Sequence, residues 1–346
     1  MSIRLIDIAK KTGFSVSTVS RVLHSKSDKY KISKETKRCI QAAAKELGYR
    51  PNILARSLKL KKTHNIGLIV PDVANPFFAT LVKSIGKEVR ESDYSLILSD
   101  SDENISIERD SIHLLLEKRV EGLIIASVGI DDSHLKNLKI SKTPVVIVDR
   151  YFDELIFDTV CVNNYKGAYL GTQYLIREGH RRIAFIQGLQ GTSTNDERLQ
   201  GYKSALKEAN VPVDDKYIVG DDFRSLNGYL QTKTLLNLDQ APTAIFTAGD
   251  LIALGAFQAI KEENLHIPDD ISIATFDDPS FASHLSPPLT AIRQPIKEMG
   301  IIAVKLVLEK IENFNRDAKK VILEPQLVVR NSVSKVFEPV IQNSTI

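Results

Sequence analysis

Five aspartates follow apolar runs of the chain, each at the point where a run ends. The runs IGLIVP, LILS, VVIV, IFTAG and SIATF precede Asp72, Asp100, Asp149, Asp250 and Asp277. Carboxylates bind pairs of hydroxyl groups, and aromatic rings pack against the apolar face of a sugar. The pattern predicts a site for a polyhydroxylated ligand, although each aspartate alone could equally be a helix cap beside a strand end. Neighbouring side chains that fit this site are Arg150, Phe77, Phe78, Tyr151 and Phe276.

A second set of side chains, near the N-terminus, fits contacts to DNA. Arg21 can bind guanine O6 and N7 with two hydrogen bonds, and Val16 can meet a thymine methyl group. Ser17 follows Val16, and Arg21 comes one helical turn later on the same face. The alternative for each residue is an ordinary cap or a solvent-facing helix position. Hydroxyl groups that suit phosphate contacts, which carry no sequence information, are those of Ser15, Thr18 and Ser20.

The chain lacks the signatures of common catalytic and cofactor sites. There is no G-x-G-x-x-G opening a helix, no G-x-x-x-x-G-K-[ST] and no G-x-S-x-G. The seven histidines are scattered, and His180, just before an apolar run, fits a structural role better than a catalytic one. Cys39 and Cys161 have no C-x-x-C neighbour. We therefore expect no enzyme, no metal and no cofactor.

Positive charge is concentrated in the first part of the chain. The 346 residues carry a formal net charge of +3. Residues 1–62 hold 16 Lys and Arg against 4 Asp and Glu, whereas the remainder holds 30 against 39. A basic head on an acidic body is typical of a nucleic-acid-binding protein with a second function. Apolar runs are too short to cross a membrane and no secretion signal is evident, so a cytoplasmic protein is expected.

The elements that must position the first of these residues are three short helices. Apolar residues recur at helical spacing from Leu5 to Thr12, and Gly13 stops that helix. Ser15 can cap a second helix, and Ser33 can cap a third that ends at Gly48. Two helices joined by a tight turn, with a third packed across them, form a helix-turn-helix domain whose second helix reads the major groove.

The rest of the chain alternates short β-branched runs with amphipathic helices. Near-continuous apolar strands in such an order predict parallel sheets covered on both faces. Ligands in open α/β sheets bind beyond the carboxyl ends of the strands, which is where the aspartates stand. The expected strands are 65–71, 94–98, 122–126, 145–149, a run from 160, 182–187, 244–247 and 271–275, with helices at 77–91, 107–117, 167–177, 197–209 and 251–262.

Two stretches of the head, IDIAKKTGFSVSTVSRVL and ISKETKRCIQAAAKELGYRPNILARSLK, carry a family resemblance. They are similar to the DNA-binding head of lactose-repressor/galactose-repressor (LacI/GalR) transcription regulators. The loop between them, His24–Lys31, is longer than usual and adds lysines. The resemblance implies that residues 51–62 form a hinge helix on operator DNA, with a leucine wedged into the minor groove. The hinge residues implied at the DNA are Asn52, Ala55, Arg56 and Leu58.

Motifs of the body extend the resemblance to Val329. They include VEGLIIAS, PVVIVDR, ERLQGYKSAL, PTAIFTAGDLIALGAFQAI and IPDDISIATFDD. These resemble the LacI/GalR effector domain, which is itself similar to periplasmic sugar-binding proteins. Pro76 would shape the turn that presents a phenylalanine, and Gly249 departs from the Asn of some sugar-binding members. The sugar contacts that the resemblance implies are Phe77, Asp149, Arg198, Asp250 and Asp277.

The resemblance also implies a domain organisation. The body is expected to consist of two Rossmann-like subdomains of periplasmic-binding-protein type, joined by three crossover strands, behind a small all-α head. A homodimer would pair the helices at 76–91 and 250–262 across a two-fold axis. The polar tail has no apolar heptads, which argues against a coiled-coil tetramer. The expected borders are 1–50 for the head, 51–62 for the hinge, 63–160 with 291–322 and 161–290 with 323–332 for the subdomains, and 333–346 for the tail.

These features together favour a sequence-specific transcriptional regulator, most simply a repressor, that reads a pseudo-palindromic operator as a homodimer. A small-molecule effector, most simply a sugar, would bind between the subdomains; pentoses, hexoses, disaccharides and purines all suit such a cleft. The alternatives are an α/β enzyme with a DNA-binding appendage, a transporter's solute-binding protein, and a regulator that uses a phosphorylated carrier protein as corepressor. The helix at 299–312 lacks the arginine pair that this last alternative would need.

Overall fold

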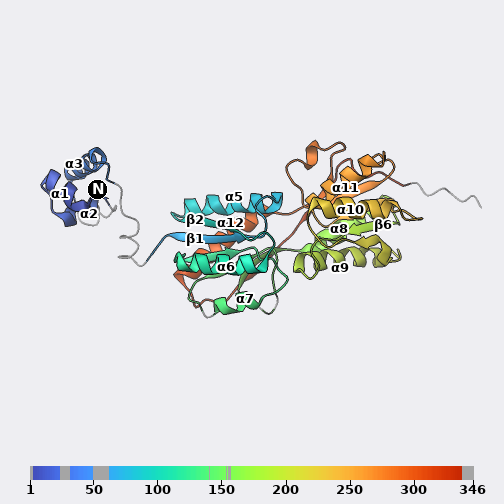
Figure 1. The fold of residues 1–346 in the computed structure, drawn as a ribbon, viewed down its shortest axis with the longest axis horizontal. Helices are drawn as coiled ribbons and strands as arrows, with labels where there is room; N and C mark the ends of the chain where they lie inside the picture. Colours follow the sequence, from blue (N-terminus) through green and yellow to red (C-terminus); the bar gives the residue numbers. More distant parts are fainter. Residues whose placement is uncertain are drawn as a thin grey trace, which may run out of the picture. The chain divides into compact units, whose positions relative to one another are not determined.

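The computed structural model describes residues 3–23, 32–49, 62–139, 141–152, 154 and 157–336. The chain divides into two compact units, Met1–Thr63 and His64–Ile346. We call the first unit the head and the second the body, and each is described by itself (Figure 1). The loop His24–Lys31 and the implied hinge contacts of Asn52, Ala55, Arg56 and Leu58 lie outside the described residues.

The head is a helix-turn-helix unit, as its sequence predicts. Its helices are α1 Leu5–Thr12, α2 Val16–Leu23 and α3 Lys34–Glu46. Gly13 ends α1 in the left-handed region at φ 73°, which glycine adopts without steric cost. The hydroxyl of Ser15 accepts the Thr18 amide hydrogen at 3.1 Å and starts α2. Side chains of all three helices form the small core, including Ile8, Val19 and Ile40, which are all fully buried.

Among the described residues, the body contains two six-stranded sheets. The first has the strand order β11-β5-β4-β3-β1-β2 and the second has the order β12-β10-β9-β8-β6-β7. All pairings are parallel except that of β10 with β12, which confirms the predicted α/β architecture. The strands are β1 Asn65–Val70, β2 Ser95–Asp100, β3 Gly122–Ile125, β4 Val145–Val148, β5 Asp158–Val162, β6 Ile183–Ile186, β7 Ile218–Val219, β8 Ala244–Thr247, β9 Ser272–Phe276, β10 Thr290–Arg293, β11 Lys320–Leu323 and β12 Gln326–Val328.

Helices cover these sheets. Helices α5 and α12 pack together against one face of the first sheet, and α6 lies on the other face (Figure 1). On the second sheet, α8 packs against α9 and α10 packs against α11. The helices are α5 Pro76–Glu91, α6 Ile105–Glu117, α7 Ser133–Lys136, α8 Asn164–Arg177, α9 Ser193–Glu208, α10 Ser225–Leu236, α11 Asp250–Glu262 and α12 Ile296–Glu312, with short 3₁₀ turns at Asn137–Lys139, Asp215–Tyr217 and Ala282–His284.

The chain passes between the two sheets three times: after β5, after β10 and after β11. The expected borders differ from these crossings by a few residues. Strand β10 pairs with β9 in the second sheet, whereas residues 291–293 were expected in the first subdomain. Strand β5 pairs in the first sheet through Val162, beyond the expected border at 160. The subdomain to which these residues belong is decided by the strand with which they pair, and no local sequence signal marks the border.

Helix α10 lies in a stretch for which the sequence pattern predicted no element. Its buried positions are small or polar, namely Asn227, Gly228 and Thr232, together with Leu235. Leu226 and Leu230 are exposed, so the usual apolar stripe is missing. A side chain at Gly228 would collide with the backbone of Ile252 in α11. The close approach of α10 and α11 therefore requires small residues at the contact. Without an apolar stripe, hydrophobic periodicity does not predict this helix.

Candidate functional site

The candidate site lies at the carboxyl ends of the strands, where Asp149 directly follows β4 and Asp277 directly follows β9. Both aspartates adopt φ 72°, an uncommon backbone conformation for a residue with a side chain. Asp250 opens α11 after β8. All three side chains are buried, although carboxylates are mostly exposed in proteins. The structure therefore places three of the five predicted aspartates in buried positions at or just after the carboxyl ends of strands.

Asp72 and Asp100 bind backbone amides of a turn, whereas the helix that follows is capped by Asn75. The Asp72 carboxylate accepts the Ala74 amide hydrogen at 2.8 Å, and that of Asp100 accepts the Val73 amide hydrogen at 2.8 Å. Both therefore stabilise the turn that follows β1.

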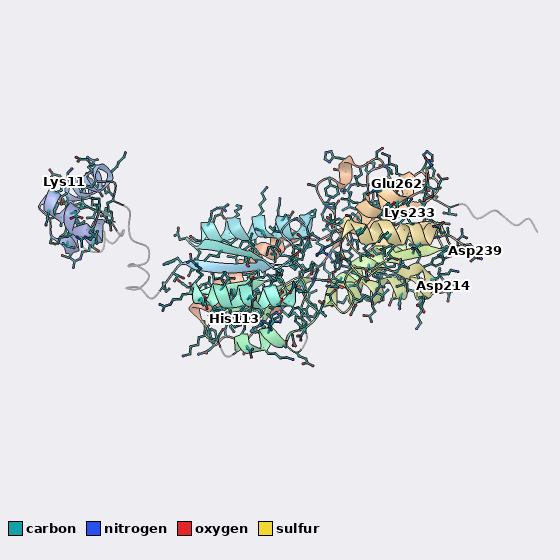
Figure 2. All side chains as sticks on the ribbon, in the orientation of Figure 1. Lys11, His113, Asp214, Lys233, Asp239 and Glu262 are labelled. Carbon is teal, nitrogen blue, oxygen red and sulfur yellow. The ribbon has the colours of Figure 1, made fainter. Side chains whose placement is uncertain are left out.

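Figure 2 places two further carboxylates, Asp214 and Asp239, at the end of the second subdomain that is remote from the first sheet. The negative charge of the body is thus partly surface charge, separate from the site.

Arg198 of α9 is the cation that the carboxylates of the second subdomain surround. Its Nε donates to Asn164 Oδ1 at 2.9 Å, and its Nη1 donates to the Ala248 carbonyl oxygen at 2.6 Å. Nη1 also lies 3.9 Å from Asp277 Oδ2. The guanidinium carbon lies 3.7 Å from the centroid of the Phe276 ring, a cation–π contact. Arg198 is only 3% exposed, so its position is fixed by these contacts.

Asp277 is held on its other side by Gln294. The Gln294 Nε2 donates to Asp277 Oδ1 at 2.5 Å. The Gln294 Oε1 is buried and has no hydrogen-bond partner among the described residues. Buried polar atoms are nearly always paired, so an unpaired acceptor beside a carboxylate is a position at which a ligand hydroxyl can donate.

Arg150 is the corresponding cation of the first subdomain. Its two terminal nitrogens donate to the Glu103 carboxylate at 2.6 and 2.8 Å, and Nη1 also donates to the Val128 carbonyl oxygen at 2.7 Å. The guanidinium carbon lies 5.9 Å from the Phe78 ring centroid and 5.3 Å from that of Phe223. Phe223 belongs to the second subdomain, so Arg150 joins the two halves of the site.

The electrostatics of the site link the two subdomains through Asp149. Burial raises the pKa of Asp149 to about 6; Arg150 and Arg198 oppose this rise, whereas Asp277 and Glu103 add to it. Burial, with the charge of Asp277, raises the pKa of Asp250 to about 7. The pKa of Asp277 is also raised by burial. Buried carboxylates that remain partly ionised near neutral pH attract hydrogen-bond donors.

The aromatic residues predicted at the site pack against other side chains of the protein. Phe77 and Phe78 are 6% and 3% exposed and belong to the core between α5 and the first sheet. Phe276 is fully buried beneath Arg198. The hydroxyl of Tyr151 donates to Glu197, and its amide nitrogen donates to Ser193 Oγ at 3.0 Å, so Tyr151 connects the loop after β4 to α9.

Three contributors to the site were not identified from the sequence: Glu103, Phe223 and Gln294. Phe223 stands in the segment GDDFRS between β7 and α10, and its ring lies so close to Gly188 that a side chain there would collide with it. A Cβ added at Gly249 would lie 3.3 Å from Phe223 and 3.9 Å from Asp277 Oδ2. No motif marks Phe223, whereas Gln294 lies in the stretch PPLTAIRQPIKEMG, which resembles the family; for both residues, proximity in the fold shows that they belong to the site.

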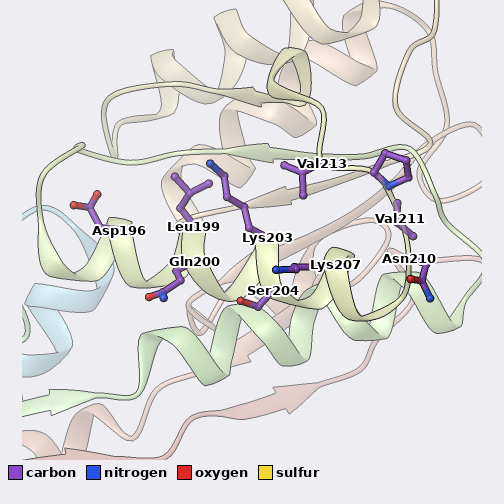
Figure 3. Close-up of a pocket in the computed structure, with 10 residues that line it drawn as sticks. Asp196, Leu199, Gln200, Lys203, Ser204, Lys207, Asn210, Val211 and Val213 are labelled. Carbon is purple, nitrogen blue, oxygen red and sulfur yellow. The ribbon is translucent and has the colours of Figure 1, made fainter.

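A groove on the surface of the body lies elsewhere and contains none of these residues. It has a volume of about 670 Å³ and is formed by the outer face of α9 and residues 210–213 (Figure 3). Lys203 and Lys207 line it from successive turns of α9. Arg198, on the buried side of the same helix, faces the candidate site instead.

In the head, α2 presents the residues predicted to contact DNA. Ser15, Val16, Ser17 and Arg21 are exposed, whereas Thr18 and Ser20 are half-buried. Val16 is 43% exposed, so its methyl groups are available for contact. The hydroxyl of Ser15 lies 2.8 Å from those of both Ser17 and Thr18, in addition to capping α2. The exposed face of α2 thus carries the side chains expected at base edges.

The two units match two families. Residues 4–52 match the bacterial regulatory proteins of the lacI family, and residues 63–332 match the periplasmic binding proteins and sugar binding domain of the LacI family. The chain therefore belongs to the LacI family. It is a DNA-binding transcriptional regulator with a helix-turn-helix head and an effector-binding body, in agreement with the charge division and the α/β pattern. Among the described residues, no helix is both long and apolar enough to span a bilayer.

Named relatives share almost the whole chain. The ribose operon repressor of Haemophilus influenzae is 38% identical over 330 residues, which cover 94% of this chain and 97% of that protein. The HTH-type transcriptional repressor PurR of Photorhabdus laumondii is 37% identical over 94% of this chain and 96% of its own length. A crystal structure of the Lac repressor dimer bound to operator and the anti-inducer ONPF matches with a TM-score of 0.87 and 28% identity, covering 96% of this chain and all of that one.

Proposed function

We propose that this chain is a repressor whose effector is a small neutral sugar of pentose size, D-ribose being the first candidate. The observation that carries the proposal is the set of Asp149, Arg198 and Asp277 with the unpaired Oε1 of Gln294. These groups offer several acceptors and one fixed cation, which suits a ligand with hydroxyl groups on neighbouring carbons. The name of the relative from Haemophilus influenzae supports ribose.

The balance of charge favours a neutral ligand over an anionic one. Asp149, Asp250, Asp277 and Glu103 face the site region beside the cations Arg150 and Arg198, and Arg150 already forms two hydrogen bonds with Glu103. A phosphorylated sugar would add negative charge where burial already raises the pKa of carboxylates. In this proposal Asp149, Arg150, Arg198 and Asp277 contact the effector, and Asp250 completes the acidic wall. Phe276, Phe77 and Phe78 support these side chains from beneath.

The same proposal assigns the head its role. Val16, Ser17 and Arg21 read base edges in the major groove, and Ser15, Thr18 and Ser20 contact phosphates. Two chains, paired through α5 and α11, bind the halves of a pseudo-palindromic operator in the cytoplasm, and the hinge residue Leu58 wedges into the minor groove at its centre. Effector binding changes operator affinity because the ligand binds the two states of the body with different affinities. The chain acts as a regulator without catalytic activity of its own.

Titration of operator DNA with and without sugars tests this function. Fluorescence anisotropy of labelled operator is measured with the full chain and D-ribose, D-xylose, D-glucose, D-fructose, hypoxanthine or guanine. We expect D-ribose to change the operator affinity at least tenfold and random DNA affinity by less than twofold. A shift with a purine alone would replace the sugar by the ligand class that the PurR name suggests. An operator affinity unchanged by every compound would contradict gating by a small molecule of these classes.

Effector affinity is expected to rise with pH. Ligand hydroxyl groups donate to ionised Asp149, whose pKa is raised to about 6, so protonation of this carboxyl at lower pH removes an acceptor. Affinity for D-ribose should therefore increase between about pH 5 and pH 7 and level off above that range, by up to about tenfold per pH unit below the pKa. Calorimetric titrations across this range measure the effect. Asp149→Asn should bind weakly with a flatter profile; an equally steep profile in this variant would assign the titration to another group.

A further inference from the structure

A buried carboxylate outside the candidate site, Glu108, controls the segment that holds Arg150. Glu108 lies in the first turns of α6 and is fully buried. Its Oε2 accepts the Val128 amide hydrogen at 2.6 Å, and its Oε1 accepts the Ser127 hydroxyl at 3.0 Å. The segment after β3 is thereby tied to α6 through both oxygens of one side chain.

His134 of α7 completes this anchor. Its Nε2 lies 2.5 Å from Glu108 Oε1, and its side chain is 2% exposed. Its Nδ1 is buried and has no hydrogen-bond partner among the described residues. A buried His–Glu pair costs desolvation free energy and is not by itself a sign of stability.

The segment that Glu108 binds also contacts Arg150. The Val128 carbonyl oxygen accepts the Arg150 Nη1 hydrogen at 2.7 Å, in the residue whose amide is bound by Glu108. Gly129, at φ 86°, lets the backbone pass over the aliphatic part of the arginine, because a Cβ there would lie 2.8 Å from Arg150 Cδ. Glu103, just before α6, binds the guanidinium directly. The start of α6 thus holds Arg150 twice, once directly and once through the segment 127–129.

We propose that Glu108 is a positioning residue for the effector site, which sets effector affinity by fixing residues 127–129 around Arg150. The proposal rests on the proposed function, in which Arg150 contacts the effector. Glu108 itself has all its acceptors in use and touches no residue proposed to contact the ligand. Its influence passes through the Val128 carbonyl oxygen and the arginine stem, in addition to the attraction between its charge and that of Arg150.

A double-mutant cycle on the full chain tests this coupling. Glu108→Gln keeps the size of the side chain and one acceptor for the Val128 amide, but replaces the other acceptor by a donor. We expect it to weaken D-ribose binding about tenfold in calorimetric titrations. In the Arg150→Lys background, whose ammonium cannot reproduce the guanidinium geometry, Glu108→Gln should weaken binding by less than twofold. The same factor in both backgrounds would overturn the proposal, as would an unchanged affinity in the first.

Asp158→Asn is the matched control. Asp158 is also a buried carboxylate of the first subdomain, and it accepts the Lys319 amide hydrogen at 2.8 Å and pairs with Arg316 at 2.7 Å. It has no contact with the segment 127–129. We expect Asp158→Asn to lower the melting temperature but leave D-ribose affinity within twofold of the wild type. A tenfold loss in this control would show general loosening of the subdomain and would overturn the specific role of Glu108.

Two further measurements apply if Glu108→Gln does not fold or if D-ribose does not bind. Ser127→Ala removes one hydrogen bond from the same carboxylate and should weaken D-ribose binding two- to threefold, with the same dependence on Arg150. Without ligand, the unfolding equilibrium constants of the four cycle members should show at least fivefold coupling between Glu108 and Arg150. If the wild type binds no D-ribose, the pentose assignment is wrong. The coupling in stability then tests the positioning role by itself: its presence supports the role, and its absence overturns it.

Discussion

Arg198→Met is expected to weaken effector binding by at least a hundredfold while leaving operator binding without effector largely intact. The substitution keeps the length of an apolar stem but removes the cation that lies 3.9 Å from Asp277 and opposes the raised pKa of Asp149. Removing one partner of a buried charge cluster costs about 3–5 kcal/mol, because the remaining charges stay buried without compensation. Part of that cost lowers the free energy of unfolding, and part weakens the binding of the ligand. Calorimetric titration with D-ribose, alongside thermal unfolding, separates the two.

Arg316→Met is the control for the stability effect. Arg316 also pairs with a buried carboxylate, that of Asp158 at the start of β5, through two hydrogen bonds of 2.7 and 2.9 Å. We expect a comparable loss of stability and an unchanged D-ribose affinity. A folded Arg198→Met variant that binds D-ribose as the wild type does would exclude Arg198 from the effector site.

Arg21→Ala is expected to cost about 1–3 kcal/mol of operator binding and to relax preference at one base pair of each half-site. The side chain is exposed on α2, one turn after Ser17 and on the same face. Because a bidentate contact to guanine reads sequence, random DNA should lose less affinity than operator. Gel-shift titrations against operator, single-base variants and random DNA at one fixed salt concentration measure the difference.

Lys45→Ala provides a control of equal charge. Lys45 is exposed in the last turn of α3, outside α2. Loss of one positive charge there should affect operator and random DNA alike, through the salt-dependent term only. If Arg21→Ala also weakened both DNAs by the same factor, α2 would not be the helix that reads the bases.

Local signals in the sequence were sufficient for most elements. Gly13 ends α1, and Ser15 and Ser33 cap the helices they precede, because each of these interactions joins residues three or four positions apart. The buried strands are equally visible, since parallel strands covered on both faces read as continuous apolar runs. The longest element that they missed was α10, whose packing against α11 replaces apolar residues by small ones.

The candidate site was only partly visible for a physical reason. Aspartates at strand ends can be located by position, but whether each caps a turn, as Asp72 does, or faces a ligand depends on the order of strands in the sheet. Contacts such as Arg150 with Glu103 join residues 47 positions apart, and that of Arg198 with Ala248 spans 50. No local pattern encodes partners at such separations, because the sheet order brings them together.

By itself, the sequence determined that a basic helix-turn-helix head precedes an acidic α/β body and that carboxylates stand at the strand ends. These properties follow from local spacing and from the sum of charges. Only the tertiary structure decided that Phe223 and Gln294 join the site, that Phe276 lies beneath a cation, and that Glu108 holds the segment around Arg150. Each of these depends on two sheets whose carboxyl ends face one another, a relation between distant segments that spacing along the chain does not record.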